Sequence, residues 1–345
     1  MKAFKLIGIR QMEMMDVPAP EIAGDDDVLI RMRAVGVCGS DVHYYGTGRI
    51  GSQVVDYPFT VGHEGAGEVI EVGAGVSVVK PGDSVAIDPA WVCGECDQCL
   101  AGRPHTCRNL RYLGCPKQME GCLSELIVMP SSCCLLLPDS VSYEEAAISE
   151  PLSIGIYAVE RSVPMRGAKV GILGVGPIGL SVLMPAGVQG AEVYVTDKID
   201  GRIALARVAG AVWGGNPDNG DVVTDVLGRE TGGLDVVFEC CGEQDALDQA
   251  VDMLKPGGKL MLIGIPPSAE RVTFKIDELR RKEICIQNVR RQNGCAQKAV
   301  EQIASRSFDV NIMITHRFTF GQTGEAFDLV AQYGDGVLKA MILFD

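Results

Sequence analysis

The strongest indication of the fold is the stretch Lys169-Val170-Gly171-Ile172-Leu173-Gly174-Val175-Gly176-Pro177-Ile178-Gly179. An apolar run leads directly into a G-x-G-x-x-G turn, and a helical pattern follows the turn. The first glycine allows a tight turn, the second lets the backbone approach a pyrophosphate, and the third allows close packing of helix on strand. The helix N-terminus then presents unpaired N–H groups to the phosphates. Residues 174–179 are therefore predicted to bind a dinucleotide.

Near residue 152, before this turn, the chain changes from short strand-like runs to an alternation of strands and helices. Further along it, strand-like runs alternate with helical stretches, which predicts a parallel sheet with helices on both faces. The expected strands are Lys169–Leu173, Val193–Thr196, Asp235–Phe238, Lys259–Ile263 and Ile284–Ile286. Pro185 falls inside the helix expected after the first strand, where it removes a hydrogen bond and should kink the helix.

Further cofactor contacts are expected at the ends of these strands. Asp197 ends the second strand, where its carboxylate can accept hydrogen bonds from an adenosine ribose. Its charge would repel a 2′-phosphate, so NAD is favoured over NADP, although Lys198 weakens this preference slightly. Arg202 could cover the adenine or the ribose. Gly264 and Ile265, just after the fourth strand, are additional candidates.

Residues 1–150 contain short strand-like runs separated by glycine and proline turns. This punctuation is typical of an antiparallel, barrel-like β domain. Leu152–Val163 and Ala296–Ser305 are expected to be helical, and the chain ends in a β-like run, Ala340–Phe344. The whole chain is therefore expected to be an α/β protein with two domains.

Composition excludes several classes of partner. The net charge is −14, from 31 basic and 45 acidic residues, so neither nucleic acid nor a membrane is an expected partner. The uncharged stretch 170–191 contains six glycines and two prolines, which suits a strand, turn and helix better than a membrane span. With no pattern of a secretion signal, 13 cysteines favour thiols or metal ligands over disulfides. The cytoplasm is the expected compartment.

Four cysteines are closely spaced in the pattern Cys93-x2-Cys96-x2-Cys99-x7-Cys107. Four thiolates from one loop can wrap a tetrahedral zinc ion with no open position, which fixes the loop without taking part in chemistry. An iron–sulfur cluster and free thiols are the alternatives, but nothing else in the sequence indicates electron transfer. We expect a structural zinc site here.

A second candidate metal site combines separated segments. They are Cys38-Gly39-Ser40-Asp41-Val42-His43, Gly62-His63-Glu64 and Glu150-Pro151. A cysteine, a histidine and a carboxylate from such segments can form an open zinc site. Each also has an ordinary explanation, with Cys38 in the core, His63 as a buried imidazole and Glu64 as a surface carboxylate. Spacing alone does not decide between the two explanations.

The run Gly62-His63-Glu64-x2-Gly67-x5-Gly73-x2-Val76 resembles the signature of zinc-containing medium-chain dehydrogenases. The Cys38 segment, the four closely spaced cysteines and the glycine turn occur in that family's order, so the resemblance extends over essentially the whole chain. The chain is most similar to the polyol branch, which includes sorbitol and xylitol dehydrogenases. The segments carrying this closer match are Val42–Tyr45, Gly48–Gly51, Glu150–Gly155 and Thr315–Phe318.

The resemblance implies a GroES-like β-barrel catalytic domain made of residues 1–155 and 288–345. It implies a Rossmann NAD-binding domain over residues 156–287, with a cleft between the two domains. It also implies two zinc ions per chain, NAD as cofactor, a small polyol or sugar-derived alcohol as substrate, and a homo-oligomer, either a dimer or a tetramer.

The family's zinc ligands carry over as follows. Cys38 and His63 match ligands of the catalytic zinc, and Glu150 stands where simple alcohol dehydrogenases have a second cysteine. In the polyol branch the ligand can instead be Glu64, with Glu150 holding a water molecule at the metal, so both carboxylates remain candidates. The four closely spaced cysteines match the structural zinc site.

The resemblance also implies roles for residues near the substrate. Ser40 and His43 match a hydroxyl and an imidazole that relay the substrate's proton to solvent, a role that suits histidine because its pKa lies near working pH. The ordinary explanation of both residues is turn capping and surface exposure. Tyr44 and Arg290 match residues that face substrate, and Arg290 also the cofactor. Arg291 stands where the branch often has tyrosine, and its charge could favour a sugar acid.

The leading hypothesis is an NAD-dependent zinc enzyme that oxidises a secondary hydroxyl of a polyol to a ketose. Within the same family, L-idonate, threonine and short-chain alcohol dehydrogenases are alternatives, of which threonine is disfavoured by Ser40, Tyr44 and Arg290. A third possibility is a relative that binds dinucleotide without turnover. Loss of a zinc ligand would be its sign, and no ligand is missing.

Overall fold

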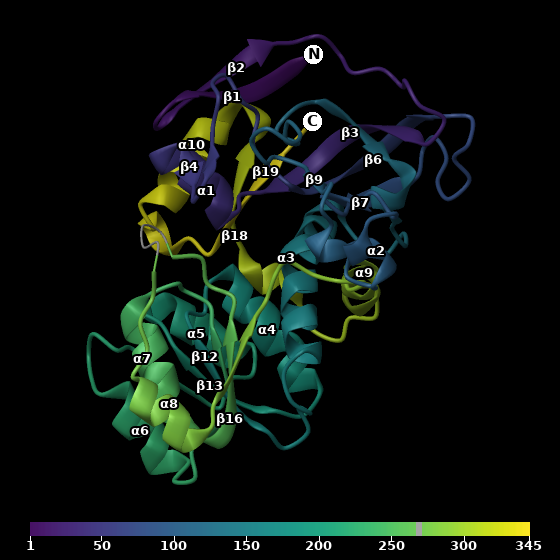
Figure 1. Cartoon of the computed structure of the whole chain (residues 1–345). Helices are drawn as coiled ribbons and strands as arrows, with labels where there is room; N and C mark the ends of the chain where they lie inside the picture. Colours follow the sequence, from purple (N-terminus) through teal and green to yellow (C-terminus); the bar gives the residue numbers. More distant parts are fainter. Residues whose placement is uncertain (267–270) are drawn as a thin grey trace. The chain divides into compact units, whose positions relative to one another are not determined.

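The computed structural model describes residues 1–266 and 271–345 (Figure 1). Contacts along the chain separate two compact units, one formed by Met1–Glu150 with Ala296–Asp345 and the other by Pro151–Cys295. Each unit has its own sheet and its own apolar core. Among the helices of the described residues, none combines the length and the apolar character needed to cross a membrane.

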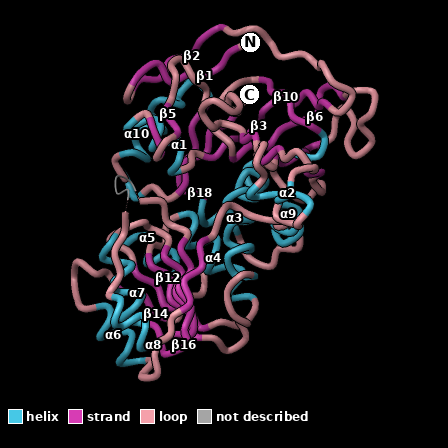
Figure 2. Tube along the Cα trace, in the orientation of Figure 1, coloured by secondary structure: helices cyan, strands magenta, loops and turns pink. Residues whose placement is uncertain are grey.

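The unit Pro151–Cys295 is built on a six-stranded sheet whose strand pairs are all parallel (Figure 2). Its strands are β12 (Lys169–Leu173), β13 (Glu192–Thr196), β14 (Trp213–Gly215), β15 (Leu234–Glu239), β16 (Leu254–Leu262) and β17 (Cys285–Asn288). Their order, β14-β13-β12-β15-β16-β17, confirms the predicted doubly wound sheet. Of these six strands, β14 alone was not predicted, because its three residues include two glycines and form no apolar run.

Helices connect these parallel strands. They are α4 (Pro177–Val188), α5 (Asp200–Val208), α6 (Val222–Arg229), α7 (Gln244–Met253) and α8 (Ile276–Lys282). Val170, Ile172 and Val237 on the central strands are fully buried, as expected for a parallel sheet covered on both faces. Because the strand order reverses between β12 and β15, the turn after β12 lies at the topological switch point, where such sheets bind ligands.

The other unit holds a seven-stranded sheet that combines segments from both ends of the chain. Its strands are β3 (Asp27–Gly36), β6 (Glu64–Val72), β7 (Ser84–Ile87), β10 (Leu126–Pro130), β11 (Cys134–Leu136), β18 (Ile314–Thr319) and β19 (Lys339–Leu343). All pairs are antiparallel except β18 with β19. Since β19 pairs with β3 and β3 pairs with β6, the last strand of the chain lies close to the start of β6.

Shorter elements surround this sheet. They are the hairpins β1 (Lys2–Gly8) with β2 (Gln11–Asp16), β4 (Arg49–Ile50) with β5 (Gln53–Val54) and β8 (Ala90–Trp91) with β9 (Arg111–Tyr112), and the helices α1 (Gly39–Thr47), α2 (Asp97–Leu100), α9 (Ala296–Ala304) and α10 (Thr323–Ala331). The core beneath them includes Leu6, Ile30, Met32 and Phe327, all fully buried. These elements agree with the predicted β domain.

Helix α3 (Tyr143–Glu160) begins earlier than the sequence predicted, so the expected start at Leu152 is wrong. Ser142 and Glu145 form a capping box, in which the Ser142 N–H donates to Glu145 Oε2 at 2.9 Å and the Glu145 N–H donates to Ser142 Oγ at 3.2 Å. The helix then continues through Pro151. As a result, Glu150 lies within a helix.

Pro185 lies inside α4, as the sequence predicted. The carbonyl that an N–H at residue 185 would normally engage belongs to Ser181, and proline has no such donor. Gly155 of α3 packs against this same carbonyl, because a Cβ built on Gly155 would lie only 1.8 Å from the Ser181 oxygen. Pro185 therefore coincides with a close crossing of two helix backbones.

Candidate functional site

Cys38 occupies the N-cap of α1, just after β3 ends at Gly36. Ser40 Oγ donates a hydrogen bond to Cys38 Sγ at 3.3 Å, which brings the predicted relay hydroxyl to the predicted metal ligand. The N-terminus of a helix is a favourable position for a negatively charged ligand atom. The turn from β3 to α1 therefore places the side chains of Cys38 and Ser40 within hydrogen-bonding distance of each other.

His63 lies directly before β6 and is buried. Its Nδ1 lies 3.2 Å from Oδ1 of Asp41, a fully buried carboxylate that also accepts the Gly62 N–H at 3.2 Å. Burial lowers the pKa of His63, but the negative charges of Asp41 and Cys38 outweigh it and hold the pKa well above its ordinary value. The contact of Asp41 with Nδ1 fixes the ring, so Nε2 is the atom that would bind a metal.

Glu64 opens β6, and both of its carboxylate oxygens accept hydrogen bonds from Lys339 Nζ on β19, at 2.7 and 2.6 Å. Both side chains are 1% exposed. Burial lowers the pKa of Lys339, but the charge of Glu64 outweighs burial and raises this pKa above its ordinary value. Gly36 makes room for this pair, since a Cβ there would lie 2.2 Å from Glu64 Oε2. Sequence reasoning missed Lys339, because it is 275 residues from its partner.

Glu150 is also buried, and its Oε1 accepts a hydrogen bond from Tyr112 Oη at 2.9 Å. The Tyr112 ring lies against His63, with 5.5 Å between ring centroids. Burial raises the pKa of Glu150 to about 7; the negative charge of Glu64 acts in the same direction, while His63 opposes it. A carboxyl group with this pKa can both accept and release a proton near neutrality.

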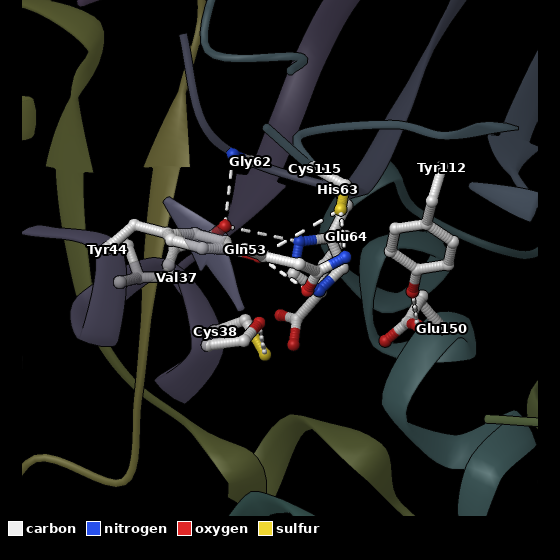
Figure 3. A network of polar contacts seen from close by, with 12 residues as sticks. Val37, Cys38, Tyr44, Gln53, Gly62, His63, Glu64, Tyr112, Cys115 and Glu150 are labelled. Atoms are coloured by element: carbon white, nitrogen blue, oxygen red, sulfur yellow. Dashed lines mark hydrogen bonds and ion pairs between the residues drawn. The ribbon is translucent and has the colours of Figure 1, made fainter. Parts of the chain in front are cut away.

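Cys38, His63 and Glu64, here called the metal set, offer ligand atoms within 4.8 Å of one another (Figure 3). Glu150 is not part of this group and is held by Tyr112 instead. One sulfur, one imidazole nitrogen and one carboxylate oxygen, with a fourth position left for water or substrate, match the donor chemistry of catalytic zinc. The residues therefore fit zinc, with Glu64 better placed than Glu150 to be the direct ligand.

The predicted structural site forms a second compact group, here called the four-cysteine lobe. Its ligand atoms come from Cys93, Cys96, Cys99 and Cys107 and lie within 4.8 Å of one another. Cys96 caps α2, and backbone N–H groups of Arg108 and Cys99 lower the pKa of its thiol to about 6. Arg108, directly after Cys107, donates a 2.9 Å hydrogen bond to Asp97 at the start of α2. Four thiolates at this separation fit a closed zinc site.

The other predicted relay residue, His43, lies one turn after Ser40 on α1. In the described part of the chain, the hydrogen bond from Ser40 goes to Cys38, and none joins Ser40 to His43. The hydroxyl of Thr47 donates to the His43 carbonyl at 2.9 Å. Burial lowers the pKa of His43, which favours the neutral imidazole, the form that accepts a proton. The structure thus brings Ser40, but not His43, into contact with the metal set.

The predicted substrate residues are divided between the two units. Tyr44 is buried on α1, and its hydroxyl donates to Gln53 Oε1 at 3.1 Å. Arg290 follows β17 in the unit Pro151–Cys295, and the next residue, Arg291, has a φ of +51°. That Tyr44 and Arg290 contact the same substrate therefore stays a prediction.

In the glycine turn, each predicted residue has a clear structural reason. Gly174 has a φ of +87°, which favours glycine. A Cβ on Gly179 would lie 2.1 Å from the Gly174 carbonyl oxygen, so only glycine lets α4 start this close to β12. Pro177 and Ile178 form the first turn of α4, where a missing N–H costs no helix bond. Gly176, just before them, is the N-cap of the helix.

Asp197 and Arg202 both lie at this turn. Asp197 Oδ2 accepts the Val175 N–H at 2.8 Å, and its Oδ1 accepts the Ile199 N–H at 2.9 Å. Arg202 Nη1 lies 3.4 Å from the position that a Cβ on Gly176 would take. Since each carboxylate oxygen can accept a second hydrogen bond, Asp197 can hold a ribose hydroxyl while it fixes the turn.

Sequence reasoning missed a buried carboxylate at the same edge, Glu239, at the end of β15. Its Oε1 accepts the backbone N–H groups of Cys241 and Gly242 at 2.8 and 2.6 Å. A Cβ on Gly264 would lie 2.2 Å from the Gly242 nitrogen, so Gly264 packs directly on this loop, and Ile265 after it is half exposed. The only feature of the sequence that could have indicated Glu239 is its position as a charged residue at the end of an apolar strand.

Comparison with known proteins gives consistent results along the chain. Residues 24–139 match the family model of the alcohol dehydrogenase GroES-like domain, and residues 177–306 match that of the zinc-binding dehydrogenases. A sorbitol dehydrogenase of Bacillus subtilis (strain 168) is 36% identical over 344 residues, which cover 99% of this chain and 97% of the relative. An L-idonate 5-dehydrogenase of Vitis vinifera is 35% identical, covering 96% of this chain and 92% of the relative.

A solved structure agrees with these matches. A protein of Sinorhizobium meliloti 1021, described as a zinc-binding dehydrogenase and bound to NADP, superimposes with a TM-score of 0.91. It is 29% identical, and the match covers 99% of this chain and 98% of that one. The similarity therefore extends through both units of the chain.

Proposed function

This chain belongs to the zinc-containing alcohol dehydrogenase family, and we propose that it oxidises a secondary hydroxyl of a polyol such as sorbitol or xylitol to the ketose, with NAD as hydride acceptor. The observation that carries the proposal is the metal set with Glu150 beside it. Two carboxylates close to one thiol make a hard, polar site that holds water well. Such a site suits a hydrated polyol better than an apolar primary alcohol.

When bound, zinc lowers the pKa of a substrate hydroxyl, and NAD accepts the hydride. The residues of the chain supply position and a path for the proton. Ser40, at 3.3 Å from Cys38, takes the proton of the substrate hydroxyl, and His43 on the same helix passes it toward solvent. Glu150, held by Tyr112, orients a second hydroxyl or a water molecule beside the reacting one.

A sugar acid is the second candidate substrate, because a relative 35% identical to this chain is named L-idonate 5-dehydrogenase. Arg291 is the residue whose positive charge would bind a carboxylate, whereas a neutral polyol does not need it. Short alcohols and threonine are less favoured substrates. The alternative outside the enzymes is a protein that binds a dinucleotide without turnover.

The experiment is a substrate panel on zinc-loaded protein. Sorbitol, xylitol, L-idonate, threonine and ethanol are each tested with NAD and with NADP, and kcat/KM is compared at one protein concentration. We expect a polyol with NAD to give the highest value. Higher values for ethanol or threonine would overturn the polyol assignment, and no turnover with any substrate would indicate a binding protein.

We also propose a reducing compartment such as the cytoplasm and a homo-oligomer, either a dimer or a tetramer. In support of the first, all 13 cysteines lie in the described part of the chain and none is in a disulfide. The second follows from the family resemblance. Light scattering of the purified protein measures the subunit count, and imaging of a tagged chain tests the compartment.

A further inference from the structure

A polar group of three side chains lies beside the metal set, and two of them have no role in the function proposed above. Tyr44 comes from α1, Gln53 from β5, and Cys115 from the turn after β9. Tyr44 Oη donates to Gln53 Oε1 at 3.1 Å, and Gln53 Nε2 donates to Cys115 Sγ at 2.8 Å (Figure 3). Tyr44 and Cys115 are buried, whereas Gln53 is half-buried.

Two contacts fix this group next to the metal set. The ring of Tyr112, three residues before Cys115, lies against His63 with 5.5 Å between centroids. Gly114 packs directly on the backbone just before His63, since a Cβ there would lie 2.7 Å from the Gly62 carbonyl oxygen. The turn that carries Cys115 therefore rests on the segment that carries a predicted metal ligand.

The chemistry of Gln53 suits a substrate with several hydroxyl groups. Its amide is both a donor and an acceptor, as is a hydroxyl group, so the two can bond in either sense. The sulfur that now accepts from Gln53 Nε2 is a weak acceptor. A hydroxyl oxygen is a better partner, so the amide gains when a substrate hydroxyl replaces the Cys115 sulfur. An alkyl group at the same place offers no such gain.

Resting on the proposed function, we propose that Gln53 is a specificity-determining residue. Its amide binds a hydroxyl of the substrate at a carbon remote from the one oxidised, and so favours longer polyols over short diols. Tyr44 orients the amide through its bond to Oε1. The substrate class thus becomes a polyol long enough to reach from the metal set to Gln53.

The test compares Gln53→Leu with wild type, using zinc-loaded protein and NAD. The ratio of kcat/KM for sorbitol to kcat/KM for 2,3-butanediol is measured. We expect the ratio to fall about tenfold, mainly through a higher KM for sorbitol, because one hydrogen bond to the remote hydroxyl is lost. Ser52→Ala, a change at the exposed neighbouring residue, is the control and should keep the ratio; thermal melting checks that both variants are folded.

A second variant separates the amide from the network around it. Cys115→Ala removes the sulfur but leaves the Gln53 amide in place, so the ratio should stay within about twofold of wild type. A loss equal to that of Gln53→Leu would overturn the inference, as would an unchanged ratio in Gln53→Leu. If wild type instead oxidises the diol or ethanol and no polyol at all, the proposed function itself fails.

Discussion

At the scale of single residues, Glu64 is the most constrained group of the site. Lys339 holds both of its oxygens, so the carboxylate enters the metal set with its charge already compensated. A metal ion bound there would share Glu64 with Lys339. The sequence could predict Cys38, His63 and Glu64, because their motifs are local. It could not predict Lys339, which reaches Glu64 only when the last strand of the chain joins the sheet.

Lys339→Met should destabilise the protein strongly when no metal is bound, because it leaves the Glu64 carboxylate buried without its partner. We expect a loss of about 3–5 kcal/mol in the free energy of unfolding, measured with denaturant after chelation of zinc. Added zinc should recover part of the loss, since the cation then compensates Glu64. The control is Lys2→Met, which breaks an exposed 2.8 Å pair with Asp16 and should cost under about 1 kcal/mol. Equal losses in the two variants would contradict the role given to Lys339.

Asp197 combines two functions that can be separated by substitution. Asp197→Asn removes the charge that repels a 2′-phosphate and retains an oxygen for the Val175 N–H, whereas the Ile199 N–H loses its acceptor. We expect kcat/KM with NADP to rise about tenfold relative to the value with NAD, because the repelling charge is gone and the Val175 hydrogen bond is kept. Asp200→Asn, a charge change three residues after Asp197, serves as control. Equal use of both cofactors by the wild type would show that Asp197 does not select NAD.

At the scale of elements, the start of α3 was predicted wrongly because two local signals in the sequence disagree. The capping box at Ser142 and Glu145 marks the start of the helix, but Pro151 indicates a boundary more strongly. The helix continues through the proline because its neighbours on both sides, Ser149, Glu150 and Leu152, are buried. Tertiary burial therefore overrides the local preference. Apart from β14, the strands of the parallel sheet could be predicted because each contains a short apolar run.

The crossing of α3 and α4 gives a test of packing at this scale. Gly155→Ala would place a Cβ 1.8 Å from the Ser181 carbonyl oxygen, so the helices must separate. We expect a loss of about 1–3 kcal/mol in stability, although alanine favours a helix. Gly187→Ala in α4 is the matched control, because nothing lies within 4 Å of its Cβ, and it should be neutral or stabilising. Denaturant unfolding of both variants measures the difference. A stabilised Gly155→Ala protein would show that the close crossing is not required.

At the scale of the whole molecule, both groups of metal ligands belong to the unit that contains the two ends of the chain. The four-cysteine lobe lies within residues 93–107, so its spacing alone predicted it. The metal set depends on β3, α1 and β6, and its surroundings depend on β19 and α3. Local motifs can therefore indicate the ligands, whereas the residues around the ligands follow from strand pairing over long distances in sequence.

This division predicts how the molecule responds to loss of either metal. Wild type should contain two zinc ions per chain by elemental analysis, one in the metal set and one in the four-cysteine lobe. Cys99→Ser should reduce the content to one, lower the melting temperature and promote aggregation, while substrate selectivity is retained, because the closed site only holds its loop. His63→Ala should also reduce the content to one but abolish turnover, with a smaller change in melting temperature. A single zinc ion in freshly purified wild type would contradict one of the two sites, and the variant that leaves this content unchanged would identify which.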